Sequence, residues 1–542
     1  MRNSSNIFTV AFVAVLCGTA AHAQTVNWRV LGGESGSVTS PGWPVGVHRT
    51  LADESIANVG ANLVGVRLVN EVTLDGYWSL RQGVFQRYAQ TGTAGSTGPG
   101  RAGADSAHVF LSLGGGWGDA GPDGQRVFGG LAGPAGSGSG SSATYGIWRA
   151  DGTNNVEIAR TLTDQALGPG LGAGYVFAHS STFADARSLG GGQVLIDGDV
   201  SSPTGVASRM IARHVPGQGN RPCTRSGSTD PLVGPGLAAG DFFTSAGVPA
   251  DVAVTPAGRV YGRLQTDDSR VGIWELCNGA PRVIALDNET GALGPNIGLA
   301  TATFTRSIER PLPGLPGTFF FFSQFRASDS SSPTTGLFHH DGSRNRRAAM
   351  NDSAGFYGPN FGTATWRAFD IDSLSVAGRY AAFSASVTTD DGGNPTGLWR
   401  VRSGQSPELV ALRGIIGAYA PEPGRTWGDF SAIAMLPSGD IAVQSTTEPG
   451  SESAVWLLSQ GLPPRRILTV GQALTIPTST GPVASAVNGI AIVTGGARHA
   501  AGFDTWAAAD GSIFLHPVVD TYGEVLIAAM PSDRIFADGF EQ

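Results

Sequence analysis

A three-residue pattern returns eight times along this chain, at intervals of 57 to 70 residues. Each copy is a small residue, a variable and mostly apolar residue, and a large apolar residue. The clear copies end at Trp78, Trp148, Trp274, Phe338, Trp399 and Trp456, and the weaker ones end at Met210 and Phe514. A feature that recurs over the whole chain predicts one repeated structural unit rather than several unrelated domains.

Two further landmarks keep the same period. Gly-Pro followed by Gly or Asn begins at Gly98, Gly168, Gly234, Gly294 and Gly358, and Pro421–Gly424 stands where the next copy is expected. A glycine that opens an apolar run recurs at Gly60, Gly124, Gly192, Gly258, Gly317, Gly378, Gly439 and Gly502. The order of the three landmarks is constant, so each unit buries its apolar face by stacking on its neighbours.

The seventh repeat indicates what the unit is. Four short β-prone runs, separated by Pro/Gly turns, occupy residues 408–412, 432–436, 441–446 and 454–458. Repeated units of four antiparallel strands are typical of propellers, whose radial closure protects the sheet edges. We therefore predict an all-β chain that forms a single β-propeller of about eight four-stranded blades. Seven blades are the alternative, if the first or last repeat only completes a neighbour.

Composition supports this fold and excludes several functions. The chain has 80 Gly and 32 Pro but only 14% charged residues, and its 35 basic residues are all arginine. A chain without lysine holds no P-loop, no Schiff-base lysine and no Ser-x-x-Lys hydrolase motif. The formal charge of −8 argues against nucleic acid as a partner, because such proteins carry a basic surface.

The N-terminus has the features of a signal peptide. Arg2 precedes a short apolar stretch at residues 7–16, and Ala21-His22-Ala23 matches a cleavage site. Cys17 is a weaker alternative, as a lipid attachment site, because no small residue precedes it. We assign residues 1–23 to a signal peptide, 24–530 to the repeat domain and 531–542 to a C-terminal tail. With no transmembrane segment after cleavage, the protein is expected to be exported, to the periplasm, the cell surface or the medium.

Two cysteines, Cys223 and Cys277, remain after cleavage. An even number in an exported chain predicts one disulfide, and two unpaired, partly buried thiols are the alternative. Neither cysteine has a partner at zinc-ligand spacing.

Three segments resemble ligand motifs locally. Residues 98–103 fit the Gly-x-Gly-x-x-Gly dinucleotide pattern, but a proline follows the first glycine and no helix is predicted after it. His339-His340-Asp341 gathers metal-ligand side chains, yet adjacent residues of a strand point to opposite faces. Residues 390–394 lack the ligand spacing of a calcium loop. We interpret all three as turns or strand ends, and predict no catalytic, cofactor-binding or metal-binding residue.

The aromatic residues divide into two groups. One group occupies equivalent repeat positions, which predicts packing between adjacent sheets. Its members are Trp78, Trp148, Trp274, Phe338, Trp399, Trp456 and Phe514. Trp43 and Trp117 stand outside the pattern and are the candidates for a binding surface.

Several segments resemble known proteins. Val410–Gly414, Ala420–Gly424 and Gly378–Phe383, together with the Gly-Ile-Trp copies, resemble the repeats of a widespread group of uncharacterised bacterial secreted proteins. Residues 536–541 resemble a C-terminal tail found on many exported proteins of Gram-negative bacteria. Neither resemblance implies an activity.

Two functions fit these observations. The first is a non-catalytic exported scaffold, expected to be a monomer without cofactor, that binds an unknown extracellular protein, glycan or surface component. The alternative is a polymer-degrading enzyme whose carboxylates converge from different blades in the central channel. Such an arrangement leaves no local motif in a sequence.

Overall fold

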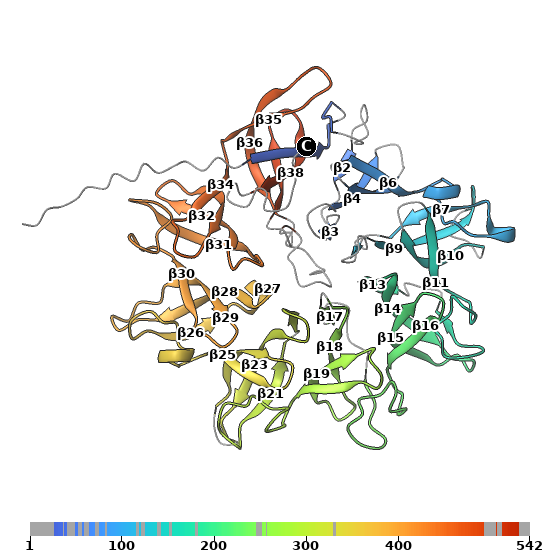
Figure 1. Ribbon diagram of the computed structural model, residues 1–542, viewed down its shortest axis with the longest axis horizontal. Helices are drawn as coiled ribbons and strands as arrows, with labels where there is room; N and C mark the ends of the chain where they lie inside the picture. The colour runs from blue at the N-terminus through green and yellow to red at the C-terminus, as the bar shows by residue number, and fades with distance from the viewer. Residues whose placement is uncertain are drawn as a thin grey trace, which may run out of the picture.

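The chain folds into antiparallel β-sheets. The computed structural model describes residues 27–35, 37–40, 49–51, 57–58, 64–70, 75–81, 84–114, 119–120, 125–137, 142–150, 154–178, 183–244, 252–255, 257–309, 311–328, 332–492, 506 and 512–530. Within these residues eight sheets follow one another along the chain and stand around a common centre (Figure 1). We number them 1 to 8 in chain order. The predicted signal peptide and C-terminal tail lie outside the described residues.

The first four sheets use the following strands. Sheet 1 contains β2 (Arg49–Leu51), β3 (Ala57–Asn58), β4 (Val64–Asn70), β5 (Asp75–Arg81) and β6 (Val84–Gln90). Sheet 2 contains β7 (His108–Leu113), β8 (Asp119–Ala120), β9 (Arg126–Pro134), β10 (Thr144–Ala150) and β11 (Asn155–Arg160). Sheet 3 contains β12 (Val176–Phe177), β13 (Phe183–Gly190), β14 (Gln193–Ser201), β15 (Ala207–Val215) and β16 (Gly219–Arg225). Sheet 4 contains β17 (Val252–Val254), β18 (Val260–Gln265), β19 (Val271–Leu276) and β20 (Arg282–Leu286).

The second half of the chain continues this arrangement. Sheet 5 contains β21 (Thr303–Ile308), β22 (Leu312–Pro313), β23 (Phe319–Arg326), β24 (Thr334–His340) and β25 (Asn345–Met350). Sheet 6 contains β26 (Thr365–Phe369), β27 (Ser375–Ala377), β28 (Tyr380–Thr388), β29 (Thr396–Arg402) and β30 (Glu408–Leu412). Sheet 7 contains β31 (Thr426–Met435), β32 (Ile441–Glu448), β33 (Glu452–Leu458) and β34 (Arg465–Thr469). Sheet 8 contains β35 (Ala473–Ile476), β36 (Val483–Ala491), β37 (Ile513–Val519), β38 (Gly523–Met530) and β1 (Asn27–Gly33).

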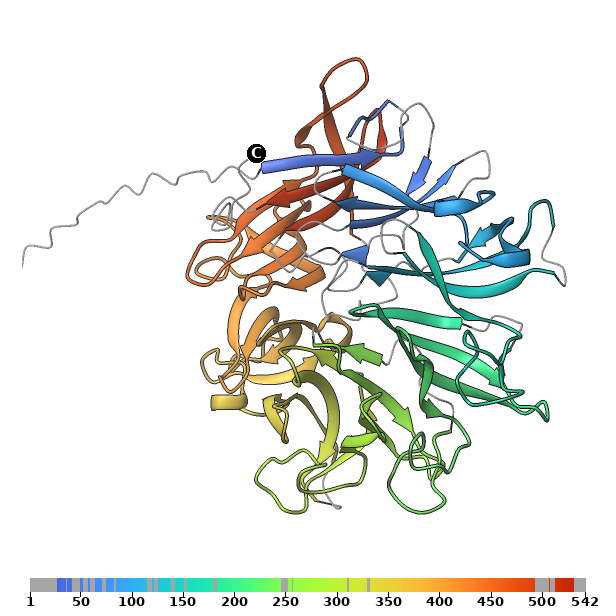
Figure 2. The ribbon, with the colours of Figure 1, turned by 45° about the vertical axis from the view of Figure 1, so that its right-hand side comes forward.

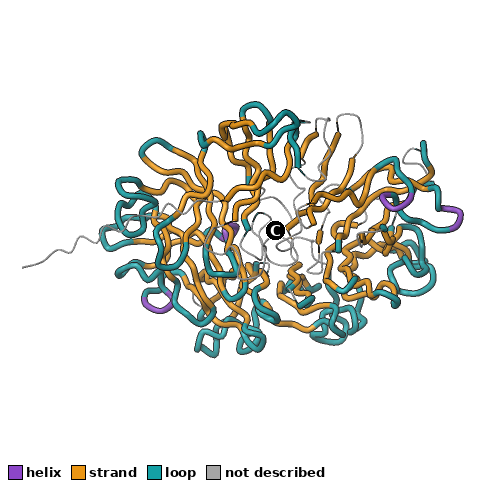
Figure 3. Tube along the Cα trace, turned by 45° about the horizontal axis from the view of Figure 1, so that its top comes forward, coloured by secondary structure: helices purple, strands orange, loops and turns teal. Residues whose placement is uncertain are grey.

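Helix is confined to short 3-10 turns among the described residues (Figure 3). These are η1 (Gly95–Thr97), η2 (Gly103–Asp105), η4 (Gly355–Tyr357) and η5 (Ile371–Ser373). None of them is long and apolar enough to cross a membrane, and the same holds for every helix in the described part of the chain. The prediction of an all-β chain is therefore confirmed.

The prediction of four strands in each sheet is too simple. In sheets 1, 2, 3, 5 and 6 two short strands occupy the first position and pair with the same second strand. In sheet 5 the break falls at Pro311, between β21 and β22, where the missing N–H cannot join a ladder. In sheet 6 the 3-10 turn η5 separates β26 from β27.

The strand grouping predicted for the seventh repeat is wrong by one strand. Residues 408–412 form β30, which pairs with β29 and completes sheet 6. Sheet 7 begins at β31 and ends at β34, a strand that the sequence analysis did not include. Sequence motifs mark where a repeat lies but not which sheet its first and last strands join. That depends on the strand with which each of them forms hydrogen bonds, which can lie on the other side of a long loop.

The first described strand belongs to the last sheet. Strand β1 pairs with β38 in antiparallel register, with Trp28 opposite Ala529 and Gly33 opposite Val525. In Figure 2 the dark-blue strand lies against the red strands. Residues 37–39 continue this attachment, since Val38 bridges Thr478 and the Ser479 amide donates to the Ser37 carbonyl oxygen over 3.0 Å. The first and last described strands therefore belong to one sheet.

The buried core lies between sheets. Seven clusters of buried apolar side chains each join a sheet to the next one along the chain, from sheets 1 and 2 through to sheets 7 and 8. Residues 319–322 of β23 are four consecutive phenylalanines, and all are buried. Phe319 and Phe321 pack toward sheet 4, whereas Phe320 and Phe322 pack toward sheet 6. A strand covered on both faces is apolar at every position rather than at alternate ones.

Candidate functional site

The recurring aromatic residues are buried in equivalent positions of their sheets. All seven lie on or beside the third strand of a sheet and are at most 9% exposed. In six of the sheets the pairing of this strand with the next shifts register at the aromatic residue, which marks a β-bulge. The bulge turns the ring back over the small residue two positions earlier. A Cβ on Gly272 would lie 2.8 Å from the ring of Trp274, which explains the glycine.

In the Gly-Pro motif, the proline carbonyl oxygen accepts a hydrogen bond from the indole N–H of the recurring tryptophan. Trp148 Nε1 donates to the Pro99 carbonyl oxygen over 2.9 Å, and Trp274 Nε1 donates to Pro235 over 3.2 Å. The residue after each proline has positive φ, which favours Gly or Asn. These residues are Gly100, Gly170, Gly236, Asn296 and Asn360. Both motifs therefore serve the framework of the fold.

The dinucleotide-like segment, residues 98–103, is part of that framework too. Arg101 is 8% exposed, and two of its nitrogens donate to the Glu157 carboxylate over 3.1 and 2.7 Å. A third nitrogen contacts His108 Nδ1 at 3.1 Å. Only the three-residue η2 follows, so no α-helix N-terminus is present to receive a pyrophosphate.

A set of asparagines was missed in the sequence. Asn155, Asn220 and Asn345 each stand at the start of, or within, the fourth strand of a sheet and are buried. Their side-chain amides donate to the preceding sheet and to the glycine of its Gly-Pro loop, as Asn220 does to Ile158 and Gly168 over 3.1 and 2.8 Å. Sheets 4, 6 and 7 have Pro281, Pro407 and Pro464 at the equivalent position. Because some sheets have asparagine there and others proline, the position does not stand out as a repeated residue in the sequence.

His339-His340-Asp341 does not converge on one point. The His339 ring packs on Phe320 at 4.6 Å, and its Nδ1 lies 3.0 Å from Ser403 Oγ. His340 stacks on Phe319 at 5.0 Å, on the opposite face of the strand. Burial lowers the pKa of His339 to about 4 and also lowers that of His340. Both imidazoles are therefore neutral at pH 7, and each is held by packing.

Asp341 and Asp391 each lie in a turn, and their carboxylates accept hydrogen bonds from residues of the same turn. Burial alone would raise the pKa of Asp341, but hydrogen bonds from Ser343 and Arg346 outweigh it and hold the pKa well below its usual range. Asp391 accepts from the Thr389 hydroxyl, which lowers its pKa, and from the Gly393 amide over 3.1 Å. Within the described part of the chain, no three His, Cys, Asp or Glu side chains are placed to hold a metal ion.

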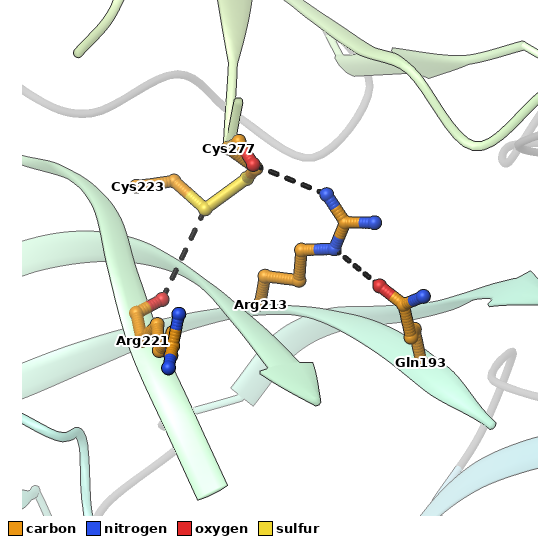
Figure 4. The surroundings of a disulfide bond; sticks show 5 residues. All are labelled: Gln193, Arg213, Arg221, Cys223 and Cys277. Carbon is orange, nitrogen blue, oxygen red and sulfur yellow. Dashed lines mark hydrogen bonds between the residues drawn. A yellow bond between two sulfur atoms is a disulfide. The ribbon is translucent and has the colours of Figure 1, made fainter. Parts of the chain in front are cut away.

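Cys223 and Cys277 are at bonding distance, with their sulfurs 2.03 Å and their Cα atoms 4.6 Å apart (Figure 4). Cys223 lies in β16 and Cys277 follows β19, so the bond ties sheet 3 to sheet 4. Arg213 reinforces the same junction by donating to the Cys277 carbonyl oxygen over 3.1 Å and to Gln193 Oε1 over 2.6 Å.

The loops lie at two opposite ends of each sheet. For sheets 3 to 6 we call one end the turn face; it carries the turns between first and second strands and between third and fourth strands. It comprises residues 190–193, 213–221, 255, 257–259, 275–282, 314–318, 339–346, 377–380 and 400–408. The opposite end, the loop face, carries residues 201–207, 225–243, 265–271, 286–303, 326–328, 332–334, 350–365, 388–396 and 412–426, which include the Gly-Pro loops. Trp43 and Trp117, the predicted candidates for a binding surface, lie outside the described residues.

Comparison with known proteins gives a family and several structures of similar shape. Residues 59–506 match a family described as a family of unknown function (DUF7453). No curated protein sequence matches the chain. Similar solved structures include the WD40 domain of SCAP from fission yeast, with 10% identity, 94% of this chain and 99% of that chain covered, and a TM-score of 0.37. The β-propeller domain of the Trilobed protease from Pyrococcus furiosus is 7% identical, with 79% and 99% covered and a TM-score of 0.30. The polysaccharide lyase Uly1 is 10% identical, with 89% and 91% covered and a TM-score of 0.31.

Proposed function

Since the chain belongs to the DUF7453 family, whose function is unknown, we propose from its own structure that it is an exported, non-catalytic scaffold. In this proposal the eight sheets are the blades of a single propeller. The loops at the ends of the blades bind a protein, a glycan or another component of the cell surface.

The pairing of β1 with β38 supports a single closed ring. An open row of sheets would leave the outer edge of sheet 8 unpaired and exposed to association with other chains. Here β1 covers that edge, and Leu31 and Val38 of the N-terminal segment are at most 1% exposed. Pairing of the first and last described strands in one sheet is the arrangement by which a propeller closes, and it supports the proposed ring.

The proposal of a binding function rests on a division of roles: buried residues hold the sheets together, and the loops at the ends of the sheets are left free to vary. Among the described residues, the seven clusters of buried apolar side chains each join neighbouring sheets, and the recurring Gly, Trp, Pro and Asn residues lie at those junctions. The loops at the two ends of the sheets differ in length and sequence from one blade to the next. Such loops can diversify without disturbing the fold, which suits recognition.

The buried charged groups support a non-catalytic reading. Arg101 is paired with Glu157, Arg209 with Asp197, and Arg282 with Glu275. The two buried histidines contact Ser403 and Asn345 and stack on phenylalanines, away from one another. These groups have neighbours that fix their positions. Ser403 and His339 do form a hydroxyl–imidazole contact of the kind a nucleophile and base make, but the His339 ring is buried against Phe320.

Export is proposed from two features. Residues 1–23 have the sequence of a signal peptide, and a disulfide between neighbouring sheets suits an oxidising compartment. N-terminal sequencing of the protein recovered from cells tests this part. The expected first residue is Gln24, and a chain that retains Met1 would contradict it.

Affinity capture tests the binding function. The chain beginning at Gln24 is immobilised and exposed to envelope and medium fractions, and each retained component is then titrated in purified form. We expect saturable binding of a component whose mass is unchanged after release. Turnover of a bound polymer, lost when one carboxylate in the central channel is replaced, would establish the enzymatic alternative instead.

A further inference from the structure

The two ends of the sheets differ in charge. The turn face of sheets 3 to 6 carries nine arginines and three acidic residues among the described residues. The loop face of the same sheets carries five arginines and ten acidic residues. The whole chain has a formal charge of −8, so the turn face is basic against the overall balance. A charge distribution of this kind directs a charged partner to one face.

The arginines of the turn face are close neighbours across three sheets. Arg259 and Arg282 both lie beside the Glu275 carboxylate, at 3.6 and 2.6 Å. The turn that holds Arg259 reaches sheet 5, where a Cβ on Gly317 would lie 3.5 Å from the Arg259 guanidinium. The basic surface therefore continues from sheet 4 into sheet 5.

The same surface continues into sheet 6. A Cβ on Gly314 would lie 2.6 Å from the Gly378 carbonyl oxygen, directly before Arg379. Ser403 follows Arg402, and its amide donates to the Arg379 carbonyl oxygen over 3.1 Å. Its hydroxyl lies 3.0 Å from His339 Nδ1 of sheet 5. Sheets 4, 5 and 6 thus present one connected set of turns.

The acidic residues of this face are already neutralised. Glu275 is paired with Arg282, Asp341 with Arg346, and Glu408 with Arg400. Arg213 donates to the Cys277 carbonyl oxygen and to Gln193 Oε1 rather than to a carboxylate, and four further arginines of this face have no carboxylate partner within the described part of the chain. These are Arg221, Arg344, Arg379 and Arg402, of which the first three are exposed and Arg402 lies over the Tyr380 ring. Solvated guanidinium groups in excess are the feature that a polyanion would complement.

We propose that the turn face of sheets 3 to 6 binds an acidic polysaccharide, with Arg344, Arg379 and Arg402 contacting its carboxylate groups. This inference rests on the proposed binding function and names its ligand class. Guanidinium groups bind carboxylates through paired hydrogen bonds, and arginines distributed over successive turns suit charges spaced along an extended polymer.

Nucleic acid and anionic membranes fit this surface less well. Single-stranded nucleic acid requires exposed rings for base stacking, but Phe319 and Phe320, which follow the turn at 314–318, are buried, and Tyr380 lies beneath Arg402. Membrane binding requires inserted apolar side chains in addition to charge. Among the described residues of the turn face of sheets 3 to 6, Leu315 is the one large apolar side chain that is exposed.

Binding to polygalacturonate tests the proposal, with uncharged dextran as the control polymer. The chain beginning at Gln24 is titrated by calorimetry at several salt concentrations. We expect saturable binding to polygalacturonate only, weakening as salt rises because ion contacts are screened. The triple variant Arg344→Gln, Arg379→Gln, Arg402→Gln should bind at least about tenfold more weakly, since three charge-assisted contacts are lost.

A matched triple variant outside the turn face controls for net charge. Arg326→Gln and Arg413→Gln on the loop face, with Arg367→Gln in the adjoining strand β26, remove the same charge away from the turn face, and affinity should stay within about twofold because these groups lie outside the contact. Circular dichroism and melting curves establish that both triple variants are folded.

Several results would overturn the inference. They are absence of saturable binding to polygalacturonate, equal losses in the two triple variants, or tighter binding to duplex DNA or to vesicles of phosphatidylcholine with phosphatidylglycerol. If a captured partner still binds the turn-face variant at full strength, the polysaccharide proposal fails while the scaffold function stands. If the polymer is shortened, the scaffold function fails.

Discussion

Trp399 Nε1 donates a hydrogen bond of 2.9 Å to the carbonyl oxygen of Pro359, which lies 40 residues earlier in the chain. Trp399 belongs to the third strand of sheet 6, and Pro359 belongs to the loop that leads into that sheet. Two landmarks that look independent in the sequence are therefore donor and acceptor of one buried contact. Sheet 7 departs from this arrangement. Its small residue is Ala454, its loop reads Pro-Glu-Pro, and Trp456 Nε1 is buried without an acceptor among the described residues.

This difference predicts unequal effects of the same substitution. Trp399→Phe removes ring volume and leaves the Pro359 carbonyl unpaired, whereas Trp456→Phe removes ring volume and an unpaired N–H. We expect Trp399→Phe to lower the free energy of unfolding by about 1–2 kcal/mol more than Trp456→Phe does. Urea titrations of both variants measure the difference. Equal losses would show that the hydrogen bond does not contribute.

The glycine before each ring is expected to resist even a methyl group. A Cβ on Gly397 would lie 2.7 Å from its own Trp399 ring and 2.8 Å from the Ala411 carbonyl oxygen. Gly397→Ala should therefore destabilise the protein by about 1–3 kcal/mol through overpacking. Gly489→Ala in β36 is the matched control, because nothing lies closer than 4.0 Å to its added Cβ. A control variant as unstable as Gly397→Ala would contradict the explanation.

The disulfide is expected to stabilise the fold through the unfolded chain. Cys223 and Cys277 are 54 residues apart, and closing a loop of that length corresponds to about 4 kcal/mol in the chain-entropy treatment. Replacing both cysteines by alanine should lower the free energy of unfolding by an amount of that order. The oxidised protein should show no thiol at these positions in denaturing, non-reducing titration. Two reactive thiols there would refute the bond.

Acid should weaken the protein through His339. Its pKa is about 4 in the folded state, because burial disfavours the charged ring, whereas an unfolded histidine has a pKa near 6.5. Between these values only the unfolded state gains the proton, so the free energy of unfolding falls as pH falls, by up to about 3 kcal/mol. Denaturant titrations from pH 7.5 to 4 measure this slope.

Two variants assign the pH effect. His339→Phe should flatten the slope, since the titrating ring is gone. Ser403→Ala removes the contact at Nδ1 but keeps the imidazole, and it should leave most of the slope in place. An undiminished slope in His339→Phe would transfer the effect to other groups, such as His340, whose pKa is lowered as well.

Removal of the N-terminal segment should open sheet 8. A chain that begins at Pro41 lacks β1 and loses the burial of Leu31 and Val38, which together correspond to at least about 3 kcal/mol. Hydrogen exchange should then become faster at the amides of β38. The control is the chain that begins at Gln24 and keeps β1. Unchanged protection of β38 in the shorter chain would mean that β1 does not hold the sheet together.

The period of the fold was readable because the Gly and Trp residues of the third strand must recur wherever a ring folds back over a bulge. Their partners were not readable. The acceptor of Trp399 is a backbone carbonyl 40 residues away, and the position of the buried Asn345 is occupied by proline in sheets 4, 6 and 7. The charge difference between the two ends of the sheets was also hidden. This difference depends on which turns lie at the same end of the sheets, whereas the amino-acid composition gives only the summed charge of both ends.

The bond between the Glu524 amide and the Glu34 carboxylate joins residues 490 apart. Contacts between residues so far apart in sequence form late in folding, since the entropy lost by closing a long loop must be offset before the contact stabilises the chain. While the polypeptide is being made, β1 is present long before β38, and it has no partner until the final strands emerge. A product cut short at its C-terminus therefore displays an unpaired strand at its start. Molecules that contain both β1 and β38 pair the two strands, whereas molecules that lack β38 leave an edge of β1 open to association with other chains.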